Sequence, residues 1–512
     1  MFWWCLWTAL VLLCGAVVCP AYVNHDAAWY LHMARVMLDG GTIYRDVVDT
    51  NPPLIVFLTV PPVWLARLGV SATAAFKAYV FCAAFLSLFL SARLARRVWS
   101  GASDLSRGVF VSALVFVALP FVKTDFGQRE HFLILLTLPY ALAALAWTAN
   151  VPLAGGAGVL SGIAGGLGFA MKPHYLLAWV AIETSLCLVR PRGRSWRRPE
   201  AIAAAAAIAG YALLIVLFVP QYLAVAESAR RVYGGLNSSA ALLMRLPDTQ
   251  ICAVALALLL LVRLPRAACS ACAVLFAAVI GFLLAALLQL KGWSYHLYPA
   301  RAFTVLFFVA FAIGVFEGLP AITAAVRGGV RSLAAVLVLA LLVSSGRYVL
   351  EARRPVDLDL VTPLIDVIRV YAPRGPLAVL SMRTIIYPAF PAVNYTGARW
   401  SLRHNSLWFL PGLYERELQA PDAATRFRAP GAMPPLERRF YEEVVSDLCS
   451  DPPALLLIEP AQARAPAGRR ALDLSAYYGQ DARYQKLSRA YERLTTVGPF
   501  TVFKQTARAS CK

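Results

Sequence analysis

The stretch AAFKAYVFCAAFLSLFLSARLARRV, residues 74–98, is apolar over a length that can cross a lipid bilayer, and it ends in three arginines. Similar apolar runs recur through about the first 350 residues of this 512-residue chain, of which 60% is hydrophobic and only 15% charged. A soluble domain has too little interior to hide so much apolar sequence. The sequence therefore predicts an α-helical polytopic membrane protein.

Arginine clusters border the apolar runs and predict their orientation, because cytoplasmic loops carry an excess of Lys and Arg. The clusters are Arg93, Arg96 and Arg97; Arg190, Arg192, Arg194, Arg197 and Arg198; Arg263 and Arg266; and Arg327 and Arg331. With every cluster inside, the amino terminus is also inside and eleven spans result: 1–20, 74–98, 107–122, 131–150, 154–171, 175–190, 200–220, 250–264, 268–290, 302–318 and 331–347. Lipid head groups then account for the net charge of +20, and no nucleic-acid partner is predicted.

Two of the apolar runs could be something other than membrane spans. The run from Met1 to Pro20 lacks a basic start and a cleavage pattern, so it predicts a retained first helix rather than a signal peptide. The run from Leu54 to Val70 is about as long as a span, but counting it would reverse every later loop. Its two Pro-Pro pairs favour a helix that lies at the membrane interface.

The composition changes after Gly346. Residues 351–512 hold 16 of the 28 acidic residues and alternate short apolar runs, such as ALLLIEP, with charged helical stretches, such as LERRFYEEVVSDL. This alternation predicts an α/β or α+β domain at 348–512 on the periplasmic side, after a membrane domain at 1–347 whose first outer loop covers 21–73. Cys449 and Cys511 belong to the outer domain, where an oxidising compartment permits a disulfide without requiring one.

The first outer loop contains NHDAAWYLHMARVMLDGGTIYRDVVDTNPPL, residues 24–54, with four of the twelve acidic residues that precede residue 351. Carboxylates are costly near lipid, so their concentration on the outer side indicates a function. Apolar residues at helical spacing in Ala27 to Leu38 predict an amphipathic surface helix. Asp26 directly precedes this helix, and its local sequence favours an N-cap role over a catalytic one.

Ionisable residues also gather in three other segments that the topology places at the outer face. They are VKTDFGQREHF at 122–132, with Lys123, Asp125, Arg129, Glu130 and His131; QLKGWSYHLYPAR at 289–301, with Lys291, His296 and Arg301; and GFAMKPHYLL at 168–177, with Lys172 and His174. Solvated loop charges, an aromatic belt with snorkelling lysine, or an interfacial turn would each explain one segment alone. Together they supply proton acceptors and anion-binding cations, as group transfer from a phosphate requires.

These segments resemble those of the GT-C membrane glycosyltransferases. The first loop is similar to the extracytoplasmic loop of bacterial members, in which an acidic residue precedes a Y-x-D…x-P-P-L segment. KGWSYHLYP resembles their K…Y…P loop before a late span, and GLGFAMKP resembles their helix break with glycine and lysine. The resemblance covers about the first 310 residues. The class includes protein O-mannosyltransferases, aminoarabinose transferases acting on lipid A, and rhizobial galacturonosyl transferases.

The resemblance implies an inverting transferase of the bacterial inner membrane. It would move a sugar from a polyprenyl-phosphate donor to a glycan, lipid or protein acceptor on the periplasmic side. Asp26 matches the catalytic acid of the family and would act as general base, and Asp125 would orient the acceptor or the sugar. Further residues would bind the departing phosphate or shape the pocket: Arg129, Lys291, Lys172, His296, Arg301, Glu130, Tyr44, Asp46 and Asp49.

The chain departs from many family members because His25 precedes Asp26 and no acid follows it. Adjacent carboxylates would bind a divalent metal better, so we expect no obligatory metal or other cofactor. The glycine-rich AGGAGVLSGIAGGLG, residues 154–168, predicts close helix packing rather than a nucleotide-binding loop. Two alternatives stay open: an enzyme like the O-antigen ligases and polymerases, and a flippase or transporter of lipid-linked sugars.

Overall fold

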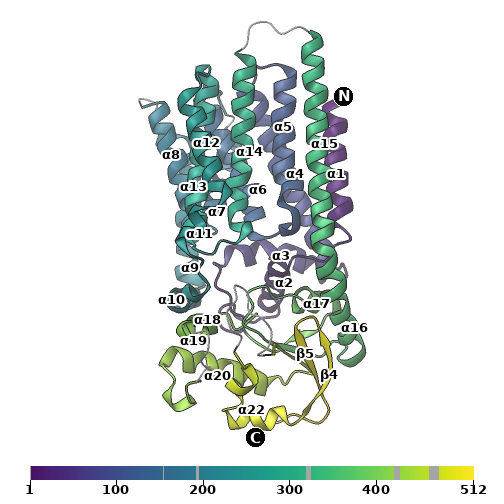
Figure 1. The fold of residues 1–512 in the computed structure, drawn as a ribbon. Coiled ribbons are helices and arrows are strands. Elements are labelled where there is room, and N and C mark those ends of the chain that lie inside the picture. The colour runs from purple at the N-terminus through teal and green to yellow at the C-terminus, as the bar shows by residue number, and fades with distance from the viewer. Residues whose placement is uncertain are drawn as a thin grey trace. The chain divides into compact units, whose positions relative to one another are not determined.

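The computed structural model describes residues 2–153, 155–191, 195–318, 324–419, 427–460 and 472–511 (Figure 1). Two residues of the predicted cytoplasmic clusters, Arg192 and Arg194, lie outside these ranges. The chain forms two compact units. Unit 1 comprises Met1–Ala21, Phe76–Phe218 and Asn237–Glu351, and unit 2 comprises Tyr22–Ala75, Val219–Leu236 and Ala352–Lys512.

Unit 1 is a helical bundle, and two of its helices, α4 and α15, extend by a few residues into unit 2. The helices are α1 (Phe2–Val18), α4 (Ala72–Val98), α5 (Asp104–Ala118), α6 (Arg129–Thr148), α7 (Gly155–Ala170), α8 (Leu176–Val189), α9 (Pro199–Phe218), α11 (Ala240–Met244), α12 (Pro247–Leu261), α13 (Arg266–Leu288), α14 (Ser294–Glu317) and α15 (Ala324–Pro355). Short 3-10 turns are η1 (Pro120–Asp125), η2 (Pro173–Tyr175) and η3 (Ser195–Arg197).

Each of the eleven predicted spans coincides with a helix of unit 1. Six segments among the described residues are long and apolar enough to cross a membrane: Ala72–Val98, Asp104–Asp125, Arg129–Thr148, Pro199–Phe218, Arg266–Leu288 and Ser294–Glu317. The protein is thus a multi-pass membrane protein, as predicted, while the total of eleven spans stays a prediction.

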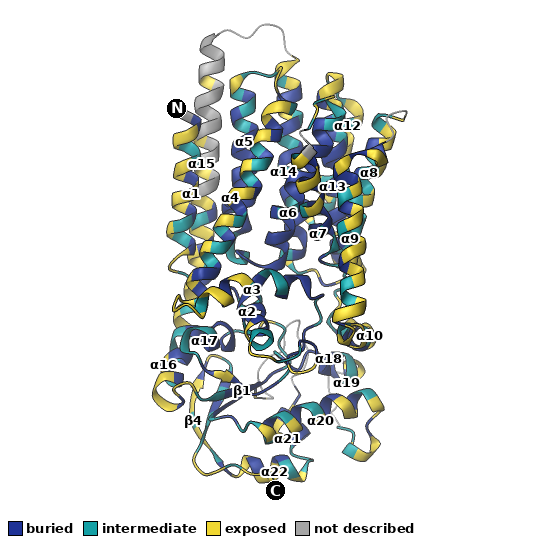
Figure 2. Ribbon diagram, turned by 180° about the vertical axis from the view of Figure 1, so that it is seen from behind, coloured by how far each residue is buried: buried dark blue, intermediate teal, exposed yellow. Residues whose placement is uncertain are grey.

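Burial differs strongly between helices of the bundle (Figure 2). Helix α6 is buried along almost its whole length, whereas α9 exposes Leu213, Leu217 and Phe218. A helix surface that faces lipid and one that faces other helices are both apolar, because helix association in a membrane depends on close packing rather than on exclusion of water. Hydrophobic periodicity alone therefore does not tell the inner helices from the outer ones.

The glycines of α7 allow a close approach to α9, as the sequence predicted. A Cβ atom on Gly162 would lie 2.4 Å from the carbonyl oxygen of Glu200, and one on Gly166 would lie 2.5 Å from that of Ala204. Real side chains do not tolerate such distances to backbone atoms. Small residues at these two positions thus bring the backbones of α7 and α9 together.

Unit 2 combines the first loop, a short segment before residue 237, and the carboxyl-terminal part of the chain. Its helical elements are α2 (His25–Leu38), α3 (Leu54–Ala66), α10 (Gln221–Val232), η4 (Tyr233–Leu236), η5 (Val356–Val361), α16 (Thr362–Tyr371), α17 (Ala389–Thr396), α18 (Leu410–Leu413), α19 (Glu415–Gln419), η6 (Pro430–Ala432), α20 (Pro435–Ser450), α21 (Leu474–Tyr478) and α22 (Ala482–Ser488). Its strands are β1 (Pro376–Leu380), β2 (Arg399–Trp400), β3 (Leu455–Ile458), β4 (Tyr491–Val497) and β5 (Phe500–Gln505).

The five strands form one mixed sheet in the order β2-β1-β3-β5-β4. Strand β1 is parallel to β2 and β3, while β5 is antiparallel to β3 and forms a hairpin with β4. The central strands β1 and β3 are short apolar runs that are almost entirely buried, as expected of strands covered on both faces. The sheet and its helices confirm the expected mixed α and β character of this part of the chain.

The first loop packs into unit 2 through its own helix and its Pro-flanked segment. The Val48 backbone N–H donates to the Arg403 carbonyl at 2.7 Å, and the Asn394 side chain donates to the Ala28 carbonyl at 3.0 Å. The Trp29 ring lies 5.0 Å from that of Phe390 on α17. Both helices predicted for this loop are present, and their position at a membrane surface and the domain division at residue 347 stay predictions.

Cys449 and Cys511 form a disulfide with a Cα–Cα distance of 5.7 Å. The bond ties the end of α20 to the segment after β5, across a sequence separation of 62 residues. The sequence left this pairing open because spacing alone does not show whether two cysteines meet.

Replacing Gly166 by Ala should destabilise the protein by about 1–3 kcal/mol, because the new methyl group overlaps the backbone of α9. Gly210→Ala is the matched control, since no atom lies within 4 Å of a Cβ at that position and Ala favours a helix over Gly by up to about 1 kcal/mol. Thermal unfolding of the purified proteins measures both. Equal midpoints for the two variants would contradict the close α7–α9 contact.

The double variant Cys449→Ser/Cys511→Ser should lose about 2–4 kcal/mol of stability, because the disulfide restricts the unfolded chain. Cys269→Ser, at an exposed free cysteine, should change stability little. Thermal unfolding gives the stability, and maleimide labelling before and after reduction gives the thiol state. Labelling of Cys449 in the unreduced, folded protein would show that the pair is not bonded.

Candidate active site

Four basic residues of unit 1 lie within electrostatic reach of His296. Four positive or titratable groups act on the buried ring of His296 on α14: Arg129, Lys172, His174 and Lys291. They come from the start of α6, the residue before η2, η2 itself, and the loop between α13 and α14. Three segments that are far apart in the sequence thus form one basic cluster.

Glu130 is a carboxylate that lies beside Arg129 and His296 of this basic cluster. The buried Arg129 and Glu130 form an ion pair, and the Tyr175 hydroxyl donates to Glu130 Oε1 at 2.8 Å. His296 Nε2 lies 4.0 Å from the same oxygen, whereas Glu130 Oε2 has no hydrogen-bond partner among the described residues. A buried carboxylate is tolerated here because positive charge and hydrogen bonds compensate it.

Two lysines of the basic cluster are held by neutral amide oxygens. Lys172 Nζ donates to Gln289 Oε1 at 2.9 Å, and Lys291 Nζ donates to Asn237 Oδ1 at 2.6 Å. These bonds position the two ammonium groups. Burial lowers the pKa of Lys291, which lies outside the spans, to about 8. The arrangement supplies cations that suit a bound anion such as a phosphate.

Two other predicted residues of unit 1 have different surroundings. Arg301 makes a bidentate ion pair with Asp248 at the start of α12, at 2.6 and 2.9 Å. Asp125 ends η1, and its charge acts on Tyr298 of α14. The structure therefore places Arg301 in a helix-to-helix ion pair and Asp125 beside α14.

Asp26 is not the N-cap of α2, which corrects the role that its local sequence favoured. Helix α2 begins at His25, and the cap is Asn24, whose side chain accepts from the Asp26 backbone N–H at 3.0 Å. The Asp26 carboxylate lies in the first helical turn, is 22% exposed, and is 3.0 Å from His25 Nδ1. A neighbouring polar residue thus takes the capping role, and Asp26 lies partly buried in the first turn of the helix.

The remaining predicted residues shape the first loop inside unit 2. Asp46 accepts from Arg45 at 2.9 and 3.0 Å, and these hydrogen bonds, with one from the Thr42 backbone, lower the pKa of Asp46. Asp49 accepts from the Asn51 backbone N–H at 2.6 Å, and the Tyr44 hydroxyl donates to the Asn51 carbonyl at 2.6 Å. These contacts fix the turn that precedes the Pro-Pro pair.

Sequence reasoning missed the neutral partners Tyr175, Gln289 and Asn237, because a single polar residue in or beside an apolar run carries no pattern. Gln289 was the easiest of them to predict from the sequence, since it stands two residues before Lys291. No group of three or more His, Cys, Asp or Glu side chains in the described part of the chain is placed to hold a metal ion.

No protein-family model matches this sequence, and no curated protein matches it either. Its structure is similar to the crystal structure of ArnT from Cupriavidus metallidurans bound to undecaprenyl phosphate, with a TM-score of 0.59, 14% identity and 99% of both chains covered. The apo structure of the same ArnT gives a TM-score of 0.47, again at 14% identity, and the match covers 98% of this chain and 97% of that one. The structure of arabinofuranosyltransferase AftD from Mycobacteria gives a TM-score of 0.45 at 14% identity. That match covers 99% of this chain and 40% of the longer AftD chain.

At this low identity the similarity to the first of these structures shows the fold and extends over the whole chain. The sequence motifs had predicted that fold from loops that make up a small share of the residues. The protein therefore has the GT-C fold.

Proposed function

We propose that the protein is a glycosyltransferase that moves a sugar from a polyprenyl-phosphate donor to an acceptor hydroxyl or phosphate. The basic cluster carries this proposal, because Arg129, Lys172 and Lys291 all act on the same side chain, His296, in a protein with the GT-C fold. The undecaprenyl phosphate bound to the similar ArnT structure supports a lipid phosphate as the anion that they bind. The reaction would take place at the periplasmic face of the bacterial inner membrane.

The basic cluster would act on the leaving group. As the bond between the anomeric carbon and the donor oxygen breaks, negative charge grows on the polyprenyl phosphate. Cations already in place stabilise that charge more strongly in the transition state than in the bound donor. Arg129 and Lys291 are the main candidates for phosphate contacts, with Lys172 and His296 beside them.

Asp26 would act as general base when the acceptor is a hydroxyl. It would remove the hydroxyl proton as the acceptor oxygen attacks the anomeric carbon, and direct displacement would invert the configuration there. Its position at the start of α2, without a capping task, supports this role. Asp125 would orient the acceptor or the sugar. Acceptors of this kind are glycans, lipids and proteins of the cell envelope.

The structure favours this function over a transporter. Glu183, the acid deepest in a predicted span, pairs with Arg198 at 2.5 Å and accepts from the Tyr140 hydroxyl at 2.5 Å. Arg198 also contacts Glu200 at 3.3 Å. Such a compensated network holds α6, α8 and α9 together, whereas a transport pathway needs ionisable groups that release their partners.

Replacing Asp26 by Asn should reduce sugar transfer by about 100-fold or more, because the amide cannot accept the proton. The assay follows labelled sugar from a polyprenyl-phosphate donor into envelope acceptors in isolated membranes. Asp39→Asn, at the other end of α2, is the control and should stay active, since Asp39 forms exposed ion pairs with Arg35 and Arg67. Full activity of the Asp26 variant at normal abundance would refute the general-base role.

Donor affinity should fall as the pH rises from 7 to 9, because the lowered pKa of Lys291, about 8, removes its positive charge over this range. Lys291→Arg should flatten the dependence, since Arg stays charged throughout. The KM for the donor, measured across this range, tests both statements. Lys486→Arg, on the exposed face of α22, should keep the wild-type profile. A profile unchanged in the Lys291 variant would remove this residue from the phosphate site.

A further inference from the structure

The chain enters α2 through residues 22–25, of which the first three belong to no helix or strand. We call residues 22–25 the lead-in segment. Backbone groups outside regular structure need partners from elsewhere, and side chains of the carboxyl-terminal segment supply two of them. The Tyr22 backbone N–H donates to Asp357 Oδ2 at 3.3 Å, and the Val23 backbone N–H donates to the Tyr395 hydroxyl at 3.3 Å.

Arg353, near the end of α15, is buried and joins three groups around the lead-in segment. Its guanidinium donates to the Tyr22 carbonyl and to the Tyr387 hydroxyl, and it lies 3.7 Å from the Asp357 carboxylate. Asp357 thus compensates the buried charge of Arg353 and also accepts from Tyr22. A guanidinium suits this position because it is planar, always charged and carries five N–H donors.

Tyr387 contacts both Arg353 and the residue that precedes Asp26. Its hydroxyl has a backbone hydrogen bond with His25, and its ring lies edge-on to the His25 ring, with 4.8 Å between the centroids. His25 Nδ1 is in turn 3.0 Å from Asp26 Oδ1, and both side chains are mostly buried. Three successive contacts therefore connect Arg353 with the Asp26 carboxylate.

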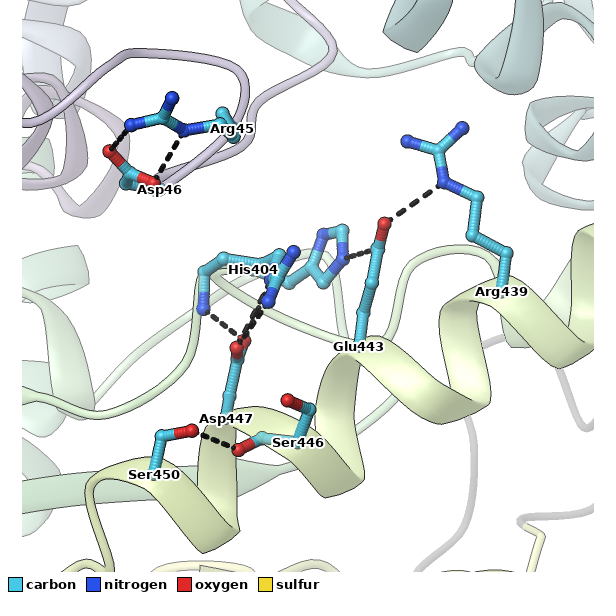
Figure 3. Close-up of polar contacts among 9 residues, drawn as sticks. Arg45, Asp46, His404, Arg439, Glu443, Ser446, Asp447 and Ser450 are labelled. Carbon is cyan, nitrogen blue, oxygen red and sulfur yellow. Dashed lines mark hydrogen bonds and ion pairs between the residues drawn. The ribbon is translucent and has the colours of Figure 1, made fainter.

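The ion pairs drawn in Figure 3 each stay within one segment of unit 2. Arg45 pairs with Asp46 inside the first loop, and His404 pairs with Glu443 inside the carboxyl-terminal segment. Such pairs stabilise each segment separately. Arg353 differs from them, because its donors join the carboxyl-terminal segment to the backbone of the first loop directly before α2.

We propose that Arg353 and Tyr387 are positioning residues for Asp26. They fix the lead-in segment and the His25 ring, and thereby hold the Asp26 carboxylate where it can receive the acceptor proton. The positioning role rests on the proposed function of Asp26 as general base, whereas the restraint on the lead-in segment does not. Catalytic groups need precise placement, and a displacement of about 1 Å can cost about 100-fold in rate.

Tyr387→Phe tests the proposal, because it keeps the ring and removes only the hydroxyl. The kcat of sugar transfer by the purified protein should fall about tenfold or more, whereas the KM for the polyprenyl-phosphate donor should change less than about twofold. Tyr414→Phe is the matched control and should keep the wild-type kcat. The Tyr414 hydroxyl likewise belongs to an arginine–carboxylate network, since it donates to Glu437 at 2.5 Å and its ring lies under Arg428.

Arg353→Lys gives a second, independent variant. It keeps the positive charge but lacks the planar fork that reaches both the Tyr22 carbonyl and Tyr387, so kcat should again fall about tenfold. Arg439→Gln is its control and should stay active, because Arg439 pairs with Glu443 on α20 and not with the first loop (Figure 3).

Combination with Asp26→Asn separates positioning from general support of the fold. If Tyr387 acts through Asp26, the double variant Asp26→Asn/Tyr387→Phe should transfer sugar as fast as Asp26→Asn alone, since both changes remove the same contribution. A further tenfold loss in the double variant would show that Tyr387 acts independently of Asp26, and would overturn the positioning role.

Hydrogen–deuterium exchange of the full-length protein in lipid nanodiscs tests the restraint without reference to catalysis. A peptide covering residues 22–30 should exchange about tenfold faster in the Tyr387→Phe and Arg353→Lys proteins than in the wild type, and Tyr414→Phe should leave it unchanged. Wild-type exchange in both positioning variants, or wild-type kcat in both, would overturn the inference and leave the transferase standing. Faster exchange in a protein whose wild type transfers no sugar would refute the transferase and confirm the restraint.

Discussion

The cost of burying charge is the constraint on which the structure depends. Glu130 and Arg129 are both almost completely buried at the start of α6, and neither would be tolerated alone. Their ion pair and the hydrogen bond from Tyr175 compensate them and connect α6 to the segment that opens α8.

The same constraint separates structural charges from functional ones. In the network of Glu183, Arg198 and Glu200, two carboxylates share one guanidinium, so no positive charge remains for an anionic ligand. The basic cluster contains one carboxylate, Glu130, which pairs with Arg129. It also contains Lys172 and Lys291, which donate to the amide oxygens of Gln289 and Asn237. The surplus of positive charge distinguishes a site built for an anion from an ion pair that only joins helices.

Sequence patterns predicted the features that repeat or that depend on neighbours in the chain. Apolar runs gave the helices of unit 1, helical spacing gave α2, and the glycines of α7 gave its contact with α9. Sequence patterns did not predict the long-range contacts, which are the pairing of Arg301 with Asp248 and the packing of the first loop against the carboxyl-terminal segment. The cap is Asn24 instead of Asp26 because α2 begins two residues earlier than predicted, at His25 instead of Ala27.

The first loop and the residues from Ala352 onward belong to one compact unit, so neither part of unit 2 can be exchanged during evolution without affecting the other. A bridge joins Val48 to His404, and Asn394 bonds to the backbone of α2, so the helix that carries Asp26 rests on strands and helices encoded more than 300 positions later. Recombination that exchanged the tail for another domain would also remove the support beneath Asp26. The two regions are therefore expected to be inherited together, with compensating substitutions across their contacts.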